Sequence, residues 1–470
     1  MAPLRQGVLK GLAWNRNAAS DVLLRLLAAA ASDAWQWLCL RPGLPAELVE
    51  AILAHPDQRV RGGFADSWTA KPGDRARLAG DPDWRVRARV AAGPAPYRRE
   101  VLPLPDTAYA RLLADPEGRV REEAACSPSI PLGLLARYAG HEDPLVRAAV
   151  CRAWDSLAPA AREALIADPD NGVRRAAALR ACAVEARYTD ELVSAGVQLV
   201  DVLGHGMLSR STAERFAASA DGAERCTLAG NPSLPADLLA RLAGDEDHLV
   251  RLAVSVRPEL SEEQRTRIDY QVLPRDRLHP LGWVLAGGES VVRQAAASAH
   301  IWLRRSASVH PRLPSDLVEQ LAEDEDDAVR LMLCEFQPSA PPGLLLRTAL
   351  TWDGYSRPDM LARPQFPRKG LARFADDADP GVRLLAVHDP DAPAGLIDRL
   401  SRDPSARVRD AAARDVRLPL ERIQELLADP EAASGAAQNP GMPLRVMHQL
   451  LDDLGVPPGT VNKGSTPGQG

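Results

Sequence analysis

The chain has 470 residues, a formal net charge of −6, and aromatic side chains at only 4% of its positions. A mildly acidic chain gives no general reason to expect binding to nucleic acid or to an anionic membrane. The apolar residues are mostly Ala and Leu, which favours closely packed helices over a β-sandwich. Richness in Arg, Ala and Pro favours a GC-rich, bacterial source.

The N-terminal segment lacks the apolar core and cleavage site of a signal peptide. The most apolar run, residues 22–31, is interrupted by Arg25 and is too short to span a bilayer. We therefore expect a soluble, cytoplasmic protein that does not enter a membrane.

A repeated unit runs through most of the chain, and residues 231–254 give its clearest copy. Its first signature is Pro-x-(Asp/Glu)-Leu-(Leu/Val), which begins at Pro45, Pro235 and Pro314. Proline fits the first turn of a helix, and the acid that follows favours the positive end of the helix dipole. Apolar residues four apart then predict one buried stripe on a short helix.

The second signature is Asp-Pro-x-x-x-Val-Arg, which occupies residues 81–87, 115–121, 168–174 and 403–409. We interpret Asp and Pro as the N-cap and first residue of a second short helix. The repeated Arg can reach an Asp or a carbonyl of the adjacent repeat. Looser copies of the signature end at Arg61, Arg147, Arg251, Arg293, Arg330 and Arg383.

The spacing of the second signature gives the length of the repeat. Val60 and Val86 are 86 − 60 = 26 residues apart, and Val382 and Val408 are again 26 apart. A pair of full helices needs more than about 30 residues. The shorter period predicts one α-helix with one very short α- or 3₁₀-helix, stacked into an all-α solenoid.

The recurring pattern resembles the leucine-rich repeat variant family, whose units are related to HEAT-like repeats. The match covers most of residues 12–451. The resemblance implies a right-handed solenoid of alternating α- and 3₁₀-helices. Some members carry a cysteine cluster that holds an iron–sulfur centre before the repeats, but Cys39 is the sole cysteine among the first 125 residues here.

Interruptions of the pattern suggest how the array is divided. We expect N-terminal repeats over residues 1–182, irregular central repeats over 183–300, C-terminal repeats over 301–454, and a disordered tail over 455–470. The pattern is weakest at residues 183–226, 255–300 and 350–370, which we expect to contain loops or worn copies.

The tryptophans are the least ordinary residues of the chain. Trp84 lies where repeats usually place polar residues, and Trp352 and Tyr355 lie in a long interruption. Trp35 lies two residues from a second tryptophan, so both cannot face one side of a helix. Exposed aromatic residues are typical anchors of protein interfaces, so we predict these four as partner-binding residues, although filling gaps between imperfect repeats is the alternative.

Known catalytic, phosphate-binding and metal-binding motifs are missing from the sequence. The histidines form no HxxxH or HExxH pair, and no cysteines are two to four residues apart. The Gly/Ser-rich stretches at residues 204–211 and 287–290 match neither GxSxG nor a P-loop. We expect no catalytic residues, no metal and no cofactor.

The leading functional hypothesis is a non-enzymatic scaffold or adaptor that binds a protein partner, and it makes no prediction of oligomeric state. The alternative is a HEAT-like nucleic-acid-binding protein that cradles DNA as some glycosylases do. That alternative needs a long basic stripe, and basic clusters such as Arg98-Arg99 and Arg304-Arg305 are short and isolated. A third reading is a helper for modification chemistry, resembling HEAT-type chromophore lyases.

Overall fold

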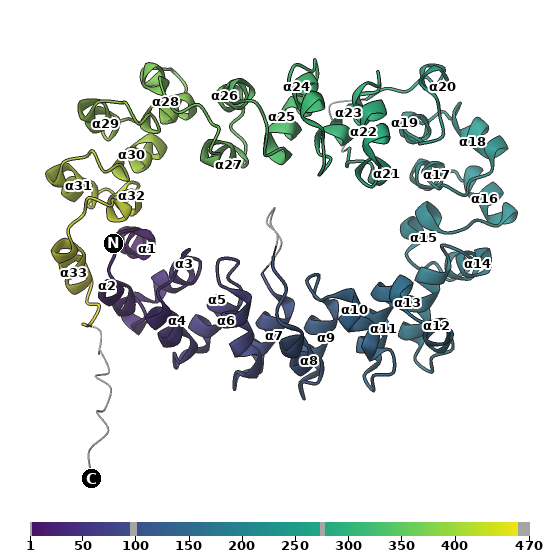
Figure 1. Cartoon of the computed structure of the whole chain (residues 1–470), viewed down its shortest axis with the longest axis horizontal. Coiled ribbons are helices and arrows are strands. Elements are labelled where there is room, and N and C mark those ends of the chain that lie inside the picture. The colour runs from purple at the N-terminus through teal and green to yellow at the C-terminus, as the bar shows by residue number, and fades with distance from the viewer. Residues whose placement is uncertain (1, 95–100, 273–277, 459–470) are drawn as a thin grey trace, which may run out of the picture. The chain divides into compact units, whose positions relative to one another are not determined.

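The fold is described from a computed structural model, which places residues 2–94, 101–272 and 278–458. These residues form 33 α-helices and five short 3₁₀-helices, with no strand among them (Figure 1). The expected all-α fold of short helical repeats is therefore confirmed. The expected handedness of the superhelix stays a prediction.

Contacts between Cα atoms divide the chain into two compact units. Unit 1 contains residues 1–161 together with 368–470, and unit 2 contains residues 162–367. These units do not coincide with the segments expected from the sequence, because the first and last repeats of the chain group together. Residues 459–470 of the expected tail lie outside the described residues.

Helices of unit 1 stack in two rows. The Val-Arg row contains the helices that the second signature opens, and their equivalents, each in contact with the next: α28 (Pro380–Val387), α30 (Ala406–Ala413), α32 (Ala433–Gln438), α1 (Ala2–Trp14), α3 (Trp35–Cys39), α5 (Gln58–Ala65), α7 (Trp84–Ala92), α9 (Gly118–Cys126) and α11 (Pro144–Val150). The Leu row contains the helices of the first signature: α29 (Ala394–Leu400), α31 (Leu420–Leu426), α33 (Leu444–Asp453), α2 (Ser20–Arg25), α4 (Ala46–Leu53), α6 (Pro72–Ala76), α8 (Asp106–Leu113) and α10 (Leu132–Leu135).

Unit 2 repeats the same alternation. Its Val-Arg row comprises α13 (Asn171–Ala181), α15 (Leu199–His205), α17 (Gly222–Ala229), α19 (His248–Ser255), α21 (Gly282–Leu285), α23 (Ile301–Ser308), α25 (Asp327–Phe336) and α27 (Arg357–Ala362). Its Leu row comprises α12 (Pro159–Ile166), α14 (Ala186–Ser194), α16 (Arg210–Ala217), α18 (Ala236–Leu242), α20 (Glu262–Thr266), α22 (Glu289–Ala296), α24 (Ser315–Ala322) and α26 (Pro342–Thr351).

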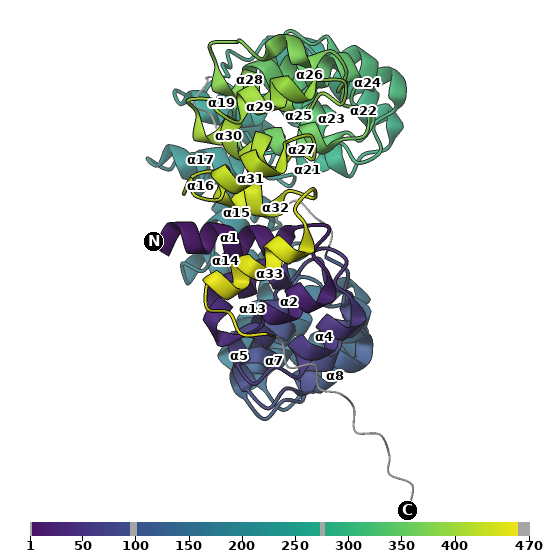
Figure 2. The ribbon, with the colours of Figure 1, turned by 90° about the vertical axis from the view of Figure 1, so that its left-hand side faces the viewer.

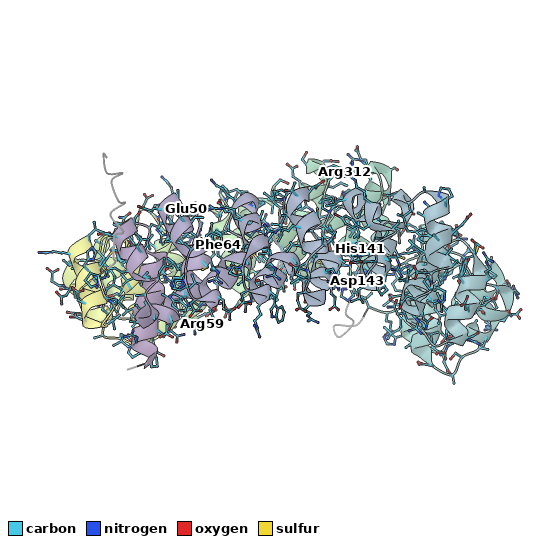
Figure 3. The ribbon with its side chains drawn as sticks, turned by 90° about the horizontal axis from the view of Figure 1, so that it is seen from below. Glu50, Arg59, Phe64, His141, Asp143 and Arg312 are labelled. Atoms are coloured by element: carbon cyan, nitrogen blue, oxygen red, sulfur yellow. The ribbon has the colours of Figure 1, made fainter. Side chains whose placement is uncertain are left out.

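The arginine of the second signature joins many repeats to the next one. Arg87, for example, binds both carboxylate oxygens of Asp115 and donates to the carbonyl of Asp81 in its own loop. Equivalent pairs at 2.6–3.0 Å are Arg61–Asp81, Arg121–Asp143, Arg225–Asp245, Arg304–Asp324, Arg383–Asp403 and Arg409–Asp429. The predicted ladder between repeats is therefore present. Figure 3 labels one of its acceptors, Asp143, to which Arg121 donates.

The aspartate of Asp-Pro has a different role from the expected one. Asp81 is not the N-cap of α7, because the side chain that accepts from the first helical amides belongs to Asp83, two residues later. Asp81 instead accepts the amide of Asp83 and the guanidinium of Arg61. His55 and His141 take this aspartate position in their own repeats, and each accepts a hydrogen bond from the amide two residues later.

The segments expected to be irregular are helical repeats. Residues 183–226 contain α14 to most of α17, and residues 350–370 contain α27. The sequence pattern predicts that Arg293 belongs to the ladder, and this prediction is wrong. Arg293 lies on α22 in the Leu row and forms solvent-exposed ion pairs with Glu289 and Asp316. Arg304, eleven residues later, holds the ladder position, because an Ile-Trp-Leu-Arg sequence replaces the usual Val-Arg there.

The buried position of the ladder predicts a large effect of removing one charge. In Asp115→Ala, the guanidinium of Arg87 would stay buried without its carboxylate, and we expect the free energy of unfolding to fall by about 3 kcal/mol. Urea denaturation of the full chain measures this change. The exposed pair Arg77–Glu50 is the control, and Glu50→Ala should leave the midpoint unchanged. Equal effects of the two substitutions would contradict a stabilising ladder.

Candidate functional site: two grooves that contain tryptophan

The four predicted partner-binding residues occupy different environments. Trp35 is 5% exposed and its indole Nε1 donates to the Leu27 carbonyl, so this side chain belongs to the core. Trp84 and Trp352 are half-buried, and Tyr355 is 74% exposed. Trp35 and Trp84 lie in unit 1, and Trp352 and Tyr355 lie in unit 2.

A groove of about 650 Å³ lies beside Trp35 in unit 1, and we name it the tryptophan groove. Its walls come from η1 (Ala29–Ala34), α3, α5, the turn after α5, and the C-terminal end of α7. Trp68, in the turn after α5, lines it and is 42% exposed. The lining residues are Ser32, Trp35, Gln36, Leu40, Arg59, Gly63, Asp66, Trp68, Arg89 and Gly93.

Two consecutive glycines in α5 create the floor of this groove. Glycine inside a helix destabilises it by about 1 kcal/mol relative to alanine, so the pair needs a packing reason. A Cβ atom at Gly62 would lie 3.1 Å from Cδ of Arg89, whereas one at Gly63 would make ordinary contacts with Cys39, at 3.5 Å from Sγ and 3.8 Å from Cβ. Gly62 thus gives room to Arg89, and Gly63 leaves the floor without a side chain.

Two guanidinium groups form the rim. Arg59 lies 4.9 Å from the centre of the Trp35 ring, and its hydrogen bonds lower the pKa of Asp57 to about 2. Arg89 donates to Asp66 at 3.0 Å, while burial raises the pKa of that carboxyl. Both arginine side chains are more than half exposed, so each retains N–H groups that face solvent. Figure 3 shows Arg59 on α5, the helix that buries Phe64.

A second groove of about 780 Å³ lies in unit 2 and contains Trp352. Leu331 and Leu344 line it together with acidic residues of the loop before α25. Its charges are largely satisfied within the groove, since Arg347 pairs with Glu323 at 2.9 Å and lowers the pKa of that carboxyl. The Trp352 indole donates to Ser356, which fixes the ring in its own repeat.

Exposed arginines also precede the valine of successive repeats, at Arg59, Arg85 and Arg119. Each pairs with a nearby acid: Asp57 at 2.7 Å, Asp83 at 3.9 Å and Glu122 at 3.3 Å. Acids in the same loops or helices therefore reduce the positive potential of this row, which a site for a nucleic-acid backbone would need.

Ser255 and His300 form a contact that resembles a nucleophile and its base. Ser255 Oγ lies 2.9 Å from Nε2 of His300, and both side chains are buried. His300 Nδ1 accepts the backbone amide of Trp302, which places the ring proton on Nε2. A histidine in that tautomer donates to the serine and cannot accept its proton. His300 therefore caps α23 through Nδ1, and it does not activate Ser255.

Trp68, Gly63 and Arg89 were not predicted from the sequence as functional residues. The available signal was the Gly62-Gly63 pair, which occupies helix positions where the other copies of the signature carry no glycine. Contact between Arg89 and the preceding repeat could not be read from spacing alone, because arginines on these helices point to several partners.

Within residues 2–94, 101–272 and 278–458, no three His, Cys, Asp or Glu side chains form a possible metal site. None of the helices in these same residues combines the length and the apolar character that crossing a bilayer requires.

Comparisons with known proteins do not identify a family for this chain. No protein-family model matches the chain, and no curated protein matches it. One crystal structure of an engineered protein aligns with 16% sequence identity, over 93% of this chain and 99% of that protein. Its TM-score is 0.15, which is too low to support any statement about fold or function.

The cap formed by His300 predicts acid sensitivity. Burial, followed by the charges of Arg265 and Arg304, lowers the pKa of His300 to about 4, whereas the unfolded chain has a value near about 6.5. Protons therefore bind the unfolded state more readily, so stability should fall as pH drops from about 6.5 to 4, by up to about 3 kcal/mol. Urea denaturation across this range measures the effect.

His300→Asn is the informative variant, because asparagine can still cap α23 but does not titrate. We expect a flatter profile between pH 6.5 and 4 than for the unmodified chain. His205→Asn, at an exposed position on α15, should retain the original profile. An unchanged slope in His300→Asn would show that His300 does not produce the acid sensitivity.

Proposed function

We propose that this chain is a non-enzymatic repeat scaffold that binds an extended segment of a protein partner. The observation that carries the proposal is the tryptophan groove, in which Trp68 is exposed above a floor that lacks a side chain at Gly63. Within this proposal the chain is a cytoplasmic member of the leucine-rich repeat variant family, and it needs no cofactor.

The chemistry of the groove supports an apolar side chain flanked by carboxylates as the bound element. Trp68 offers an aromatic face of the kind that anchors protein interfaces. Arg59 and Arg89 offer planar N–H groups that suit carboxylate oxygens. A segment that places one apolar residue on Gly63 and an acid on either side would use all three.

Nucleic acid is the second candidate, and fewer observations support it. Exposed arginines do recur in register on α5, α7 and α9, but each is paired with an acid. A nucleic-acid strand held mainly through its phosphates would have to compete with these carboxylates for the arginines. The second groove, beside Trp352, carries an acidic rim and fits a phosphate backbone less well still.

Blocking the floor of the groove tests the proposal. Peptides selected for binding to the full chain would be titrated by fluorescence anisotropy against Gly63→Leu. A leucine there meets only ordinary contacts near Cβ and would occupy the groove. We expect affinity to fall at least about tenfold, which is about 1.4 kcal/mol.

Gly133→Leu is the matched control, since Gly133 lies on α10 with no atom near its Cβ position and outside the tryptophan groove. Its affinity should equal that of the unmodified chain. Selection of no peptide, or equal affinities for both variants, would contradict the proposal. Duplex DNA binding that weakens steeply with salt would favour the nucleic-acid candidate instead.

A further inference from the structure

The first and last repeats of the chain contact each other within unit 1, and we name this contact the seam. Helix α1 packs along α32, and α2 packs on α33, as Figures 1 and 2 show. Val8, Leu9, Leu12 and Ala13 of α1 are buried, as are the alanines of α32. Both helical rows of unit 1 therefore continue from the C-terminal repeat into the N-terminal one.

The seam has the hydrogen-bond register of an ordinary junction between repeats. Asn439 donates from its side chain to the carbonyls of Ala413 and Asp415, one repeat earlier. Arg41 likewise donates to the carbonyls of Ala13 and Asn15. Across the seam, Asn15 donates to the carbonyls of Ala437 and Asn439, at 2.9 and 2.8 Å. The N-terminal repeat thus binds the last repeat as if it followed it in sequence.

Arg25 supplies a second set of seam contacts. Its side chain is 5% exposed, although it comes from the first Leu-row helix of the chain. It binds the Asp452 carboxylate at 2.5 Å and donates to the carbonyls of Val456 and Pro457. These hydrogen bonds hold residues 456 and 457 against the first repeat, although both fall within the tail that the sequence predicts to be disordered.

Close approach of the two helices depends on Gly11. A Cβ atom at this position would lie 2.5 Å from both the Ala437 Cβ and the Ser434 carbonyl oxygen. Beside this contact, Val8, Leu9 and Leu12 of α1 and the alanines of α32 are buried. Terminal repeats of solenoids usually need a polar outer face to remain soluble. Here each end covers the other.

We propose that the seam is a self-association surface that is closed within one chain, and that a second copy of this chain can occupy it. The two faces differ from each other, so pairing between copies is head-to-tail. Because one chain carries both faces, their effective concentration is on the order of millimolar, and closure within the chain prevails in dilute solution. Refolding at high concentration lets the end of one copy meet the start of another.

Engineered cysteines distinguish the two arrangements. A Cβ atom at Gly7 would lie 4.0 Å from Ser434 Cβ, which suits a disulfide bond. The double variant Gly7→Cys/Ser434→Cys should form an intramolecular disulfide when oxidised at low concentration. A mixture of the two single variants, unfolded and refolded together near about 1 mM, should form disulfide-linked heterodimers. Diluting the mixture about 100-fold before refolding should largely abolish them.

Two controls address the native cysteines and the fold. Gly133→Cys, on α10 outside the seam, should give no specific dimer when mixed with Ser434→Cys. Gly11→Leu, added to either single variant, should prevent heterodimers, and Arg25→Ala should reduce their yield without the same steric clash. An intramolecular disulfide without heterodimers at any concentration would overturn the second-copy proposal. Absence of the intramolecular disulfide would overturn the seam itself.

Discussion

Many repeats of this protein bury a carboxylate that an arginine of the preceding repeat neutralises. Asp81 and Asp115 are almost fully buried, and each receives its guanidinium from the preceding repeat. Buried carboxylates without such partners would be strongly destabilising. The Arg–Asp ladder therefore makes a single repeat unstable, and it couples the folding of consecutive repeats more specifically than their small Ala and Val side chains could.

The same dependence applies at the ends of the array. The side chain of Asn15 in the first repeat donates to two carbonyls of another repeat. The first repeat therefore needs a neighbour on the side where no repeat precedes it in the sequence. The last repeat supplies those carbonyls through Ala437 and Asn439. The buried side chain of Arg25 meets the same need with Asp452 and the carbonyls beyond α33. The seam thus satisfies polar groups that would otherwise be buried without partners.

One departure from the repeat pattern, in α5, creates a groove without interrupting the helix. The Gly62-Gly63 pair removes two side chains from α5, and Arg89 of the next repeat occupies one of the two gaps. The other gap becomes the floor of the tryptophan groove. Most worn copies elsewhere, such as α15 and α27, retain helices in register, because neighbours on both sides supply the contacts that their own sequences lack.

The sequence by itself determined the helical repeat, its period and the ladder, because helix caps, apolar spacing and the Val-Arg signature act over a few residues. It also directed attention to Trp35 and Trp352, which do line grooves. It could not distinguish Arg293 from Arg304, since the two differ in which row of helices they occupy. Only the tertiary structure decided that Trp35 is buried, that Trp68 and Arg89 share a groove, and that the two ends meet. Those outcomes depend on contacts between repeats, which local spacing does not encode.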